Sequence, residues 1–120
     1  MTKNEKKVRE YINKWKPKLF LDGYIFHIEI KDDNEDGDYA EVKVNAMYRE
    51  ATFTFFKCLF KKTDDVIEET VLHEMIHIIT DPVKEIWHKM ANGTLITHGQ
   101  SKEKCEYMTS WITQILLARK

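Results

Sequence analysis

The feature that most constrains the fold is the run from Thr70 to Ile79, TVLHEMIHII, which is apolar over most of its length. Three side chains in this run can carry a charge: His73, Glu74 and His77. A helix that is hydrophobic on nearly every side belongs in the core of a domain. Polar groups without partners are costly in such a place. The sequence therefore predicts a central helix whose polar residues have a specific task.

The spacing of the two histidines indicates what that task is. His73 and His77 are four residues apart, so on a helix their imidazoles emerge on the same face, one above the other. They can then reach one zinc ion at about 2.0–2.1 Å, the usual zinc–nitrogen distance. Glu74 leaves the helix about a hundred degrees further round. The pattern HExxH predicts zinc bound by His73 and His77, with Glu74 as the catalytic general base. The alternative is a pair of core histidines bonded to backbone carbonyls.

A catalytic zinc normally takes three protein ligands and a water, so a third ligand is expected downstream. One extended form of the motif places a histidine where this chain has Val83. The remaining downstream donors are His88, His98, Glu85, Glu103 and Glu106. Glu103 and Glu106 both flank the apolar arc of the last predicted helix, one turn apart, and either can point at the site.

Periodicity predicts an α+β fold, with a small sheet of three or slightly more strands, antiparallel or mixed, packed against helices. Apolar residues at helical spacing predict a first helix over about Lys3 to Lys16, which Pro17 ends. Strict alternation of apolar and polar residues then predicts strands. These strands are Gly23–Ile30, Tyr39–Tyr48 and Ala51–Phe56, and the last two are expected to form a hairpin.

In the second half the period changes to that of helices. A helix is expected from near Val66, capped by Asp64 or Asp65, to near Thr80, because Asp81-Pro82 disfavours its continuation. A short helix around Val83–Met90 and a last helix over about Lys102–Ala118, capped by Ser101, complete the prediction. The apolar arc of the last helix is formed by Cys105, Met108, Trp111, Ile112, Ile115 and Leu116.

Composition bounds the function classes. Nineteen basic and twenty acidic residues give a net charge of -1, so no basic footprint of a nucleic-acid binder is present. The charged N-terminus is unlike a signal peptide, and no apolar run reaches the roughly 18 residues that span a bilayer. Cys58 and Cys105 lie far apart, which favours a reducing compartment. We expect one cytoplasmic domain over residues 1–120, without nucleic-acid or membrane partners.

The run from Leu21 to Leu117 resembles a family of short HExxH proteins found in phages and prophages, minimal metallopeptidases of the gluzincin type. The similar features are an opening helix, a strand, the hairpin YAEVKVNAMYREATFTF, the metal helix DDVIEETVLHEMIHIITDPV and a final helix carrying a glutamate followed by aliphatic residues. Glu106 fits that glutamate better than Glu103 does. The aliphatic residues that follow it are Ile112, Ile115 and Leu116. The resemblance implies a zincin-like fold and a Zn²⁺ ion held by His73, His77 and Glu106.

A second family competes for the third ligand. In SprT-like zinc proteases the third ligand is a histidine followed by glycine, and the segment THGQSKEK contains His98 and Gly99 in that order. An aromatic residue expected soon after the glycine is absent. The gluzincin-type resemblance is therefore the closer one.

These observations predict a zinc-dependent peptidase that hydrolyses peptide bonds of a protein or peptide. Two other classes compete with it. The first is a catalytically silent, phage-derived module that keeps the zinc and binds a partner. The second is a structural zinc site, which needs a fourth protein ligand such as His98 or Glu103.

Overall fold

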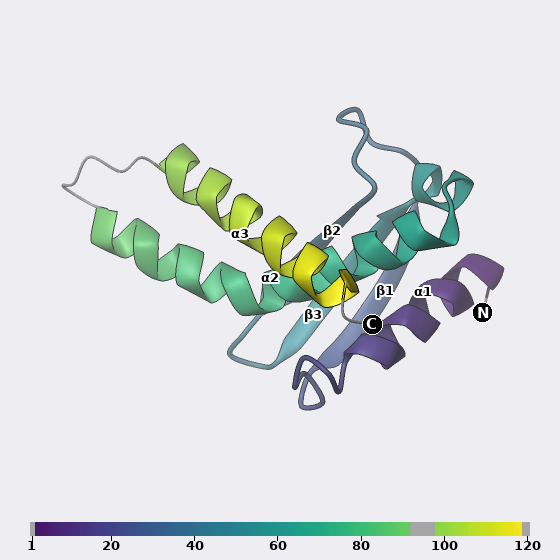
Figure 1. Cartoon of the computed structure of the whole chain (residues 1–120), viewed down its shortest axis with the longest axis horizontal. Helices are drawn as coiled ribbons and strands as arrows, with labels where there is room; N and C mark the ends of the chain where they lie inside the picture. Colours follow the sequence, from purple (N-terminus) through teal and green to yellow (C-terminus); the bar gives the residue numbers. More distant parts are fainter. Residues whose placement is uncertain (1, 92–97, 119–120) are drawn as a thin grey trace.

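The computed structural model describes residues 2–91 and 98–118, and within these ranges the side chains of residues 83–102 and 104 are left undescribed. Figure 1 shows the arrangement of the elements. The helices are α1 (Lys3–Trp15), α2 (Asp64–Ala91) and α3 (His98–Ala118), with a 3-10 turn η1 (Lys57–Lys61), and the strands are β1 (Ile25–Lys31), β2 (Ala40–Asn45) and β3 (Glu50–Phe56). Among the described residues this is a small α+β fold with a three-stranded mixed sheet, as predicted.

The sheet has the order β1-β3-β2, with β3 in the centre. The predicted hairpin is confirmed, because β2 pairs with β3 in antiparallel register, with Val42 opposite Phe53. β1 pairs with β3 in parallel, with Ile28 opposite Phe53. Within the described residues β1 and β2 are therefore the two edges of the sheet, and β2 is the antiparallel edge.

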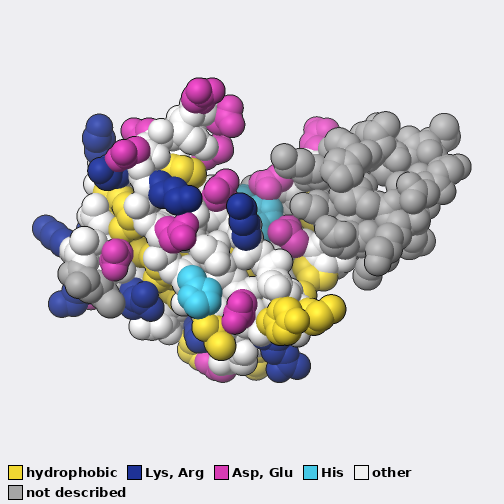
Figure 2. Space-filling model, turned by 180° about the vertical axis from the view of Figure 1, so that it is seen from behind, with side chains coloured by type: hydrophobic (Ala, Val, Ile, Leu, Met, Phe, Trp, Pro, Cys, Tyr) yellow, Lys and Arg dark blue, Asp and Glu magenta, His cyan; other side chains and the backbone are white. Residues whose placement is uncertain are grey.

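One face of the sheet is covered and the other is open. The predicted alternation holds in β1 and β2, where Phe26 and Val42 are half-buried while His27 and Lys43 are exposed. Helices α1 and α2 supply the cover. Seen from the side opposite to that of Figure 1, the molecule presents charged side chains of both signs (Figure 2).

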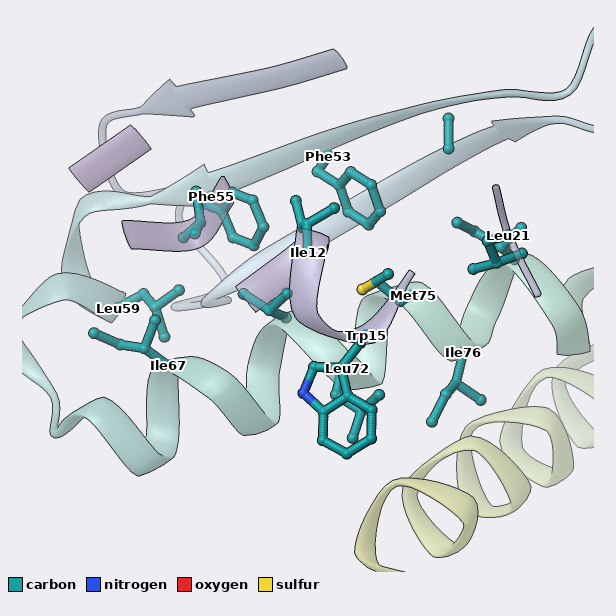
Figure 3. Packing of buried hydrophobic residues seen from close by; sticks show 14 residues of the cluster. Ile12, Trp15, Leu21, Phe53, Phe55, Leu59, Ile67, Leu72, Met75 and Ile76 are labelled. Carbon is teal, nitrogen blue, oxygen red and sulfur yellow. The ribbon is translucent and has the colours of Figure 1, made fainter. Parts of the chain in front are cut away.

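The core lies between the covered face and these two helices (Figure 3). Phe53 and Phe55 point from β3 into it, and their rings stack with centroids 6.0 Å apart. Met75 and Ile76, which lie inside the sequence HEMIH between Glu74 and His77, are fully buried there. The central position predicted for this apolar helix is thus observed, and its packing fixes how the neighbouring polar side chains project.

Glu68, a buried acidic residue, ties α1 to α2. Its Oε2 atom accepts hydrogen bonds from Trp15 Nε1 at 2.9 Å and from Lys14 Nζ at 2.6 Å. Because the carboxylate is only 4 % exposed, these charge-assisted bonds offset its loss of hydration. This contact holds α2 at a fixed rotation against the rest of the core.

Helix α2 differs from the prediction at both ends. Its cap is Thr63 rather than Asp64 or Asp65, since the Thr63 hydroxyl accepts a hydrogen bond from the Val66 amide at 3.4 Å. The expected end near Thr80 is wrong, because α2 continues through Pro82 to Ala91 and includes the separate helix predicted over Val83–Met90. A proline removes one hydrogen bond of a helix, and packing of α2 alongside α3 maintains the helix across this point (Figure 1).

Helix α3 begins earlier and is rotated relative to the prediction. It starts at His98, so Ser101 lies inside the helix and does not cap it. Of the predicted apolar arc, Cys105 is buried but Trp111 is 64 % exposed and Ile115 45 % exposed. Thr109 and Thr113 take the buried face instead. Their hydroxyls donate to the carbonyls of the residues four positions earlier, and these hydrogen bonds offset the cost of burying the hydroxyls.

A polar contact joins the two long helices. Thr80 Oγ1 and Thr109 Oγ1 lie 2.8 Å apart, and the Cys105 thiol donates to the Thr80 carbonyl at 3.4 Å. These bonds set the register between α2 and α3. Neither long helix, in the part that is described, is both long and apolar enough to cross a membrane.

Candidate metal centre

The polar residues of the apolar run converge on one side of α2. The ligand atoms of His73, Glu74 and His77 all lie within 4.8 Å of one another, close enough to hold a metal ion. The two imidazole rings are 4.9 Å apart between centroids and nearly perpendicular, at 77°. This is the arrangement that the four-residue spacing predicts, and the prediction of a metal-binding group at these residues is confirmed to that extent.

Glu106 reaches across from α3 to both imidazoles. Its Oε1 lies 2.9 Å from His77 Nε2, and its Oε2 lies 3.3 Å from His73 Nε2. Both histidines therefore present the same nitrogen, Nε2, to one carboxylate. The register set by the Thr80–Thr109 bond places Glu106 opposite the histidines.

His77 has a second partner that sequence reasoning missed. Asp81 lies one turn further along α2, and its Oδ1 is 3.2 Å from His77 Nδ1. A carboxylate at Nδ1 holds a proton there, so Nε2, which faces Glu106 at 2.9 Å, is the nitrogen that can bind a metal ion once it loses its own proton. The signal was present in the sequence, because Asp81 follows His77 at the i, i+4 spacing of helix neighbours.

Glu74 is buried in the centre, as His77 is. Its side chain is 9 % exposed, and no hydrogen bond to it is formed by the residues that the structure describes. Burial, together with the negative charges of Glu106, Asp81 and Glu41, raises the pKa of Glu74 to about 8 although the nearby His77 opposes this. A buried acidic group with a raised pKa, beside two histidines, is the kind of residue that catalysis uses.

The ion pairs between the histidines and the carboxylates shift the pKa values of His77 and Glu106 in opposite directions. Burial alone lowers the pKa of His77, but the hydrogen bonds to Asp81 and Glu106 outweigh it and raise the pKa to about 10. Hydrogen bonds from His73 and His77 in turn hold the pKa of Glu106 well below its ordinary range. The metal-free protein thus pairs a positive imidazolium with a carboxylate at the place where a metal ion would be bound.

The centre lies in an open cleft of ≈ 670 Å³. One wall is the β2 edge with the segment before it, and the opposite wall is the side of α2 that carries His73, Glu74 and His77. Glu106 of α3 also lines it. Figure 2 shows part of a histidine side chain among acidic side chains. A cleft of this size accommodates several residues of a peptide.

The remaining third-ligand candidates are placed as follows. Glu103 is exposed on α3, one turn before Glu106, and it is not among the residues that line the cleft. The side chains of Glu85, His88 and His98 fall outside the described residues, so the SprT-like alternative with His98 stays untested.

The donor set fits zinc. Two imidazole nitrogens and a carboxylate are common zinc ligands, and three protein ligands are typical of a catalytic site. The fit rests on the convergence of both Nε2 atoms on Glu106. The chain matches no protein-family model, no curated protein and no solved structure, so the assignment of this centre depends on its own residues.

Proposed function

We propose that this protein is a zinc-dependent metallopeptidase that hydrolyses peptide bonds of a protein or peptide substrate. The observation that carries the proposal is the convergence of two imidazole Nε2 atoms and one carboxylate beside a buried glutamate, in an open cleft. His73, His77 and Glu106 would hold the Zn²⁺, and Glu74 would be the general base.

Each residue has a distinct role in this proposal. Zinc, when bound, supplies a Lewis acid that polarises a carbonyl and makes water more acidic. Glu74 accepts the proton of the attacking water and passes it to the leaving amine. Asp81 keeps the His77 ring in the orientation that directs Nε2 toward the ligand position. The low exposure of Glu74 limits competing contact with bulk water.

The substrate is proposed to bind in extended form along β2. This strand is an edge in the described sheet, and β2 residues form a wall of the cleft. An extended peptide can add to such an edge through backbone hydrogen bonds, with alternate side chains directed into pockets. The HExxH helix beside an antiparallel edge strand supports the proposal of a zincin-like fold, which the resemblance of the sequence implies.

Zinc content is the first test. The purified wild-type protein should carry about one zinc per chain by elemental analysis, as a catalytic-type site requires. His73→Ala and Glu106→Ala should lose most of it. Glu103→Ala is the matched control, because it removes the same side chain one turn away, and it should retain the metal. A wild-type chain that cannot take up zinc contradicts the proposal.

Activity is the second test. Glu74→Gln keeps the shape of the side chain but cannot accept the proton, so zinc content should hold while peptidase activity on a denatured protein falls by about 10² or more. Loss of zinc in this variant would make Glu74 a ligand instead. If wild type and variant are equally inert on broad substrates, the silent partner-binding module becomes the better account.

A further inference from the structure

Acidic side chains dominate the cleft well beyond the metal centre. Six of the lining residues are acidic, and the described residues that line it include no lysine or arginine. The acidic set is Asp38, Glu41, Glu69, Glu74, Asp81 and Glu106. The chain as a whole is nearly neutral, with 19 basic and 20 acidic residues. The charge of the cleft is therefore a result of how the fold distributes these residues.

Asp81 and Glu106 form ion pairs with His77, but the contacts of Glu69 and Asp38 leave the charges of those two carboxylates uncompensated. Glu69 Oε1 accepts a hydrogen bond from the Gln114 amide at 2.7 Å, and Asp38 Oδ2 accepts one from the Asn34 amide at 3.0 Å. Both donors are neutral. In the part of the chain that is described, no ion pair joins any of the six carboxylates to a lysine or arginine. A divalent metal ion would offset two of these charges.

The cleft is also built to receive a ligand. Its volume of ≈ 670 Å³ exceeds what one ion occupies. Glu74 lines it with 9 % exposure and without a hydrogen-bond partner among the described residues. Its carboxylate faces the cleft and is therefore available to a group of the ligand. The acidic set and the candidate metal centre thus line the same cleft.

Two acidic residues lie on opposite walls beyond the metal centre. Glu69 precedes His73 by one helical turn, so it extends the line of His73 and His77 along α2 by about 6 Å. Glu41 is exposed on β2, the facing wall, where it lies opposite Thr54 in the strand register. A peptide lying along β2 passes between these two carboxylates.

We propose that the cleft selects peptide segments that carry lysine or arginine, with Glu41 and Glu69 as specificity-determining residues on its two walls. This inference rests on the proposed peptidase function and names its substrate class. Partly solvated carboxylates add a modest contribution per ion pair, a factor of about 1.5–5 each. The combined field of several carboxylates also raises the rate of encounter with cationic segments, and salt weakens it.

The test measures binding apart from hydrolysis. Zinc-loaded Glu74→Gln protein is titrated against two fluorescent peptides of equal length that differ in two positions, lysine in one and glutamate in the other. Fluorescence anisotropy should show that the lysine peptide binds about tenfold tighter or more at low salt, from the sum of such pairs. The difference should shrink at about 0.5 M salt, where screening is strong.

Three further variants locate the effect. In the Glu74→Gln background, Glu41→Gln should weaken the lysine peptide about two- to fivefold, and Glu41→Lys should weaken it more. Glu10→Gln removes the same charge from the exposed side of α1 and should leave binding unchanged. Thermal melts check that each variant folds as the parent does.

The outcomes separate this inference from the proposed function. Equal affinity for the two peptides, or an equal effect of Glu41→Gln and Glu10→Gln, overturns the inference. Hydrolysis by the wild type without preference for basic peptides has the same consequence but leaves the peptidase proposal standing. A lysine preference that is lost at high salt and reduced by Glu41→Gln supports the inference, whether or not hydrolysis is rapid.

Discussion

The burial of Glu74 predicts a pH-dependent instability of the metal-free protein that Glu74→Gln should remove. An ionised carboxylate at 9 % exposure, with no hydrogen bond from the described residues, is poorly compensated. The folded protein therefore binds the proton of Glu74 more tightly than the unfolded chain does. Glutamine fills nearly the same volume and cannot ionise, so the variant lacks this penalty.

The magnitude follows from the pKa. The pKa of Glu74 rises from an ordinary 4.5 to about 8 on folding, mainly through burial. A pKa difference of about 3.5, at about 1.36 kcal/mol per unit, corresponds to about 5 kcal/mol. Because the raised pKa belongs to an acid in the folded state, no penalty exists below about pH 4.5. The penalty grows as pH rises toward 8 and is constant above that.

The assay is urea unfolding of metal-free wild type and Glu74→Gln between about pH 5 and pH 9. The free energy of unfolding of the wild type should fall relative to the variant across this range, by about 3–5 kcal/mol in total. Other groups titrate in both proteins, so the difference between the two curves isolates Glu74. Parallel curves would refute the account of Glu74 as a buried carboxyl without partners. Bound zinc should reduce the pH dependence of the difference in free energy of unfolding between the two proteins, because a nearby cation stabilises the ionised carboxylate.

Three other substitutions test the centre and its support. Asp81→Ala should weaken zinc binding about 10–100-fold by freeing the His77 ring, and competition with a chelator measures the affinity. Asp81→Asn keeps an acceptor and should recover most of that affinity. Equal zinc affinity of the two variants would argue against an orienting role of Asp81. Glu68→Ala should lower the free energy of unfolding by about 1–3 kcal/mol because it leaves the Trp15 N–H unsatisfied, and urea unfolding should show a smaller loss for Glu68→Gln. Phe53→Ala should cost about 3–5 kcal/mol in the same assay, since it opens a cavity under the sheet; a loss below about 1 kcal/mol would mean that this part of the core collapses to fill the space.

Several parts of this protein could be predicted from the sequence because they depend on local periodicity. The alternation in β1 and β2 indicated which side chains face the core, and that assignment is confirmed. The spacing of His73 and His77 was enough to place both imidazoles on one face of a central helix. The hairpin of β2 and β3 followed from the short connection between two alternating runs.

The tertiary structure decided what depends on contacts between distant segments. Sequence patterns did not show that β1 pairs in parallel with β3, because strand order is a property of the whole sheet. The local signal at Pro82 indicated a helix end, yet packing of α2 along α3 maintains the helix past it. The buried face of α3 also differed, since Thr109 satisfies its hydroxyl within its own helix and takes a place that hydrophobicity assigned to Trp111.

The candidate centre also has one part that the sequence predicts and another that only the tertiary structure determines. His73, Glu74 and His77 come from one turn of one helix, so their sequence positions determine their mutual geometry. The position of Glu106 depends on the register between two helices, and spacing alone could not distinguish it from Glu103 one turn away. The acidic walls of the cleft bring together residues from β2, α2 and α3 that share no pattern along the chain. Only folding brings these charges within the range at which they act together, because electrostatic interactions depend on distance in space.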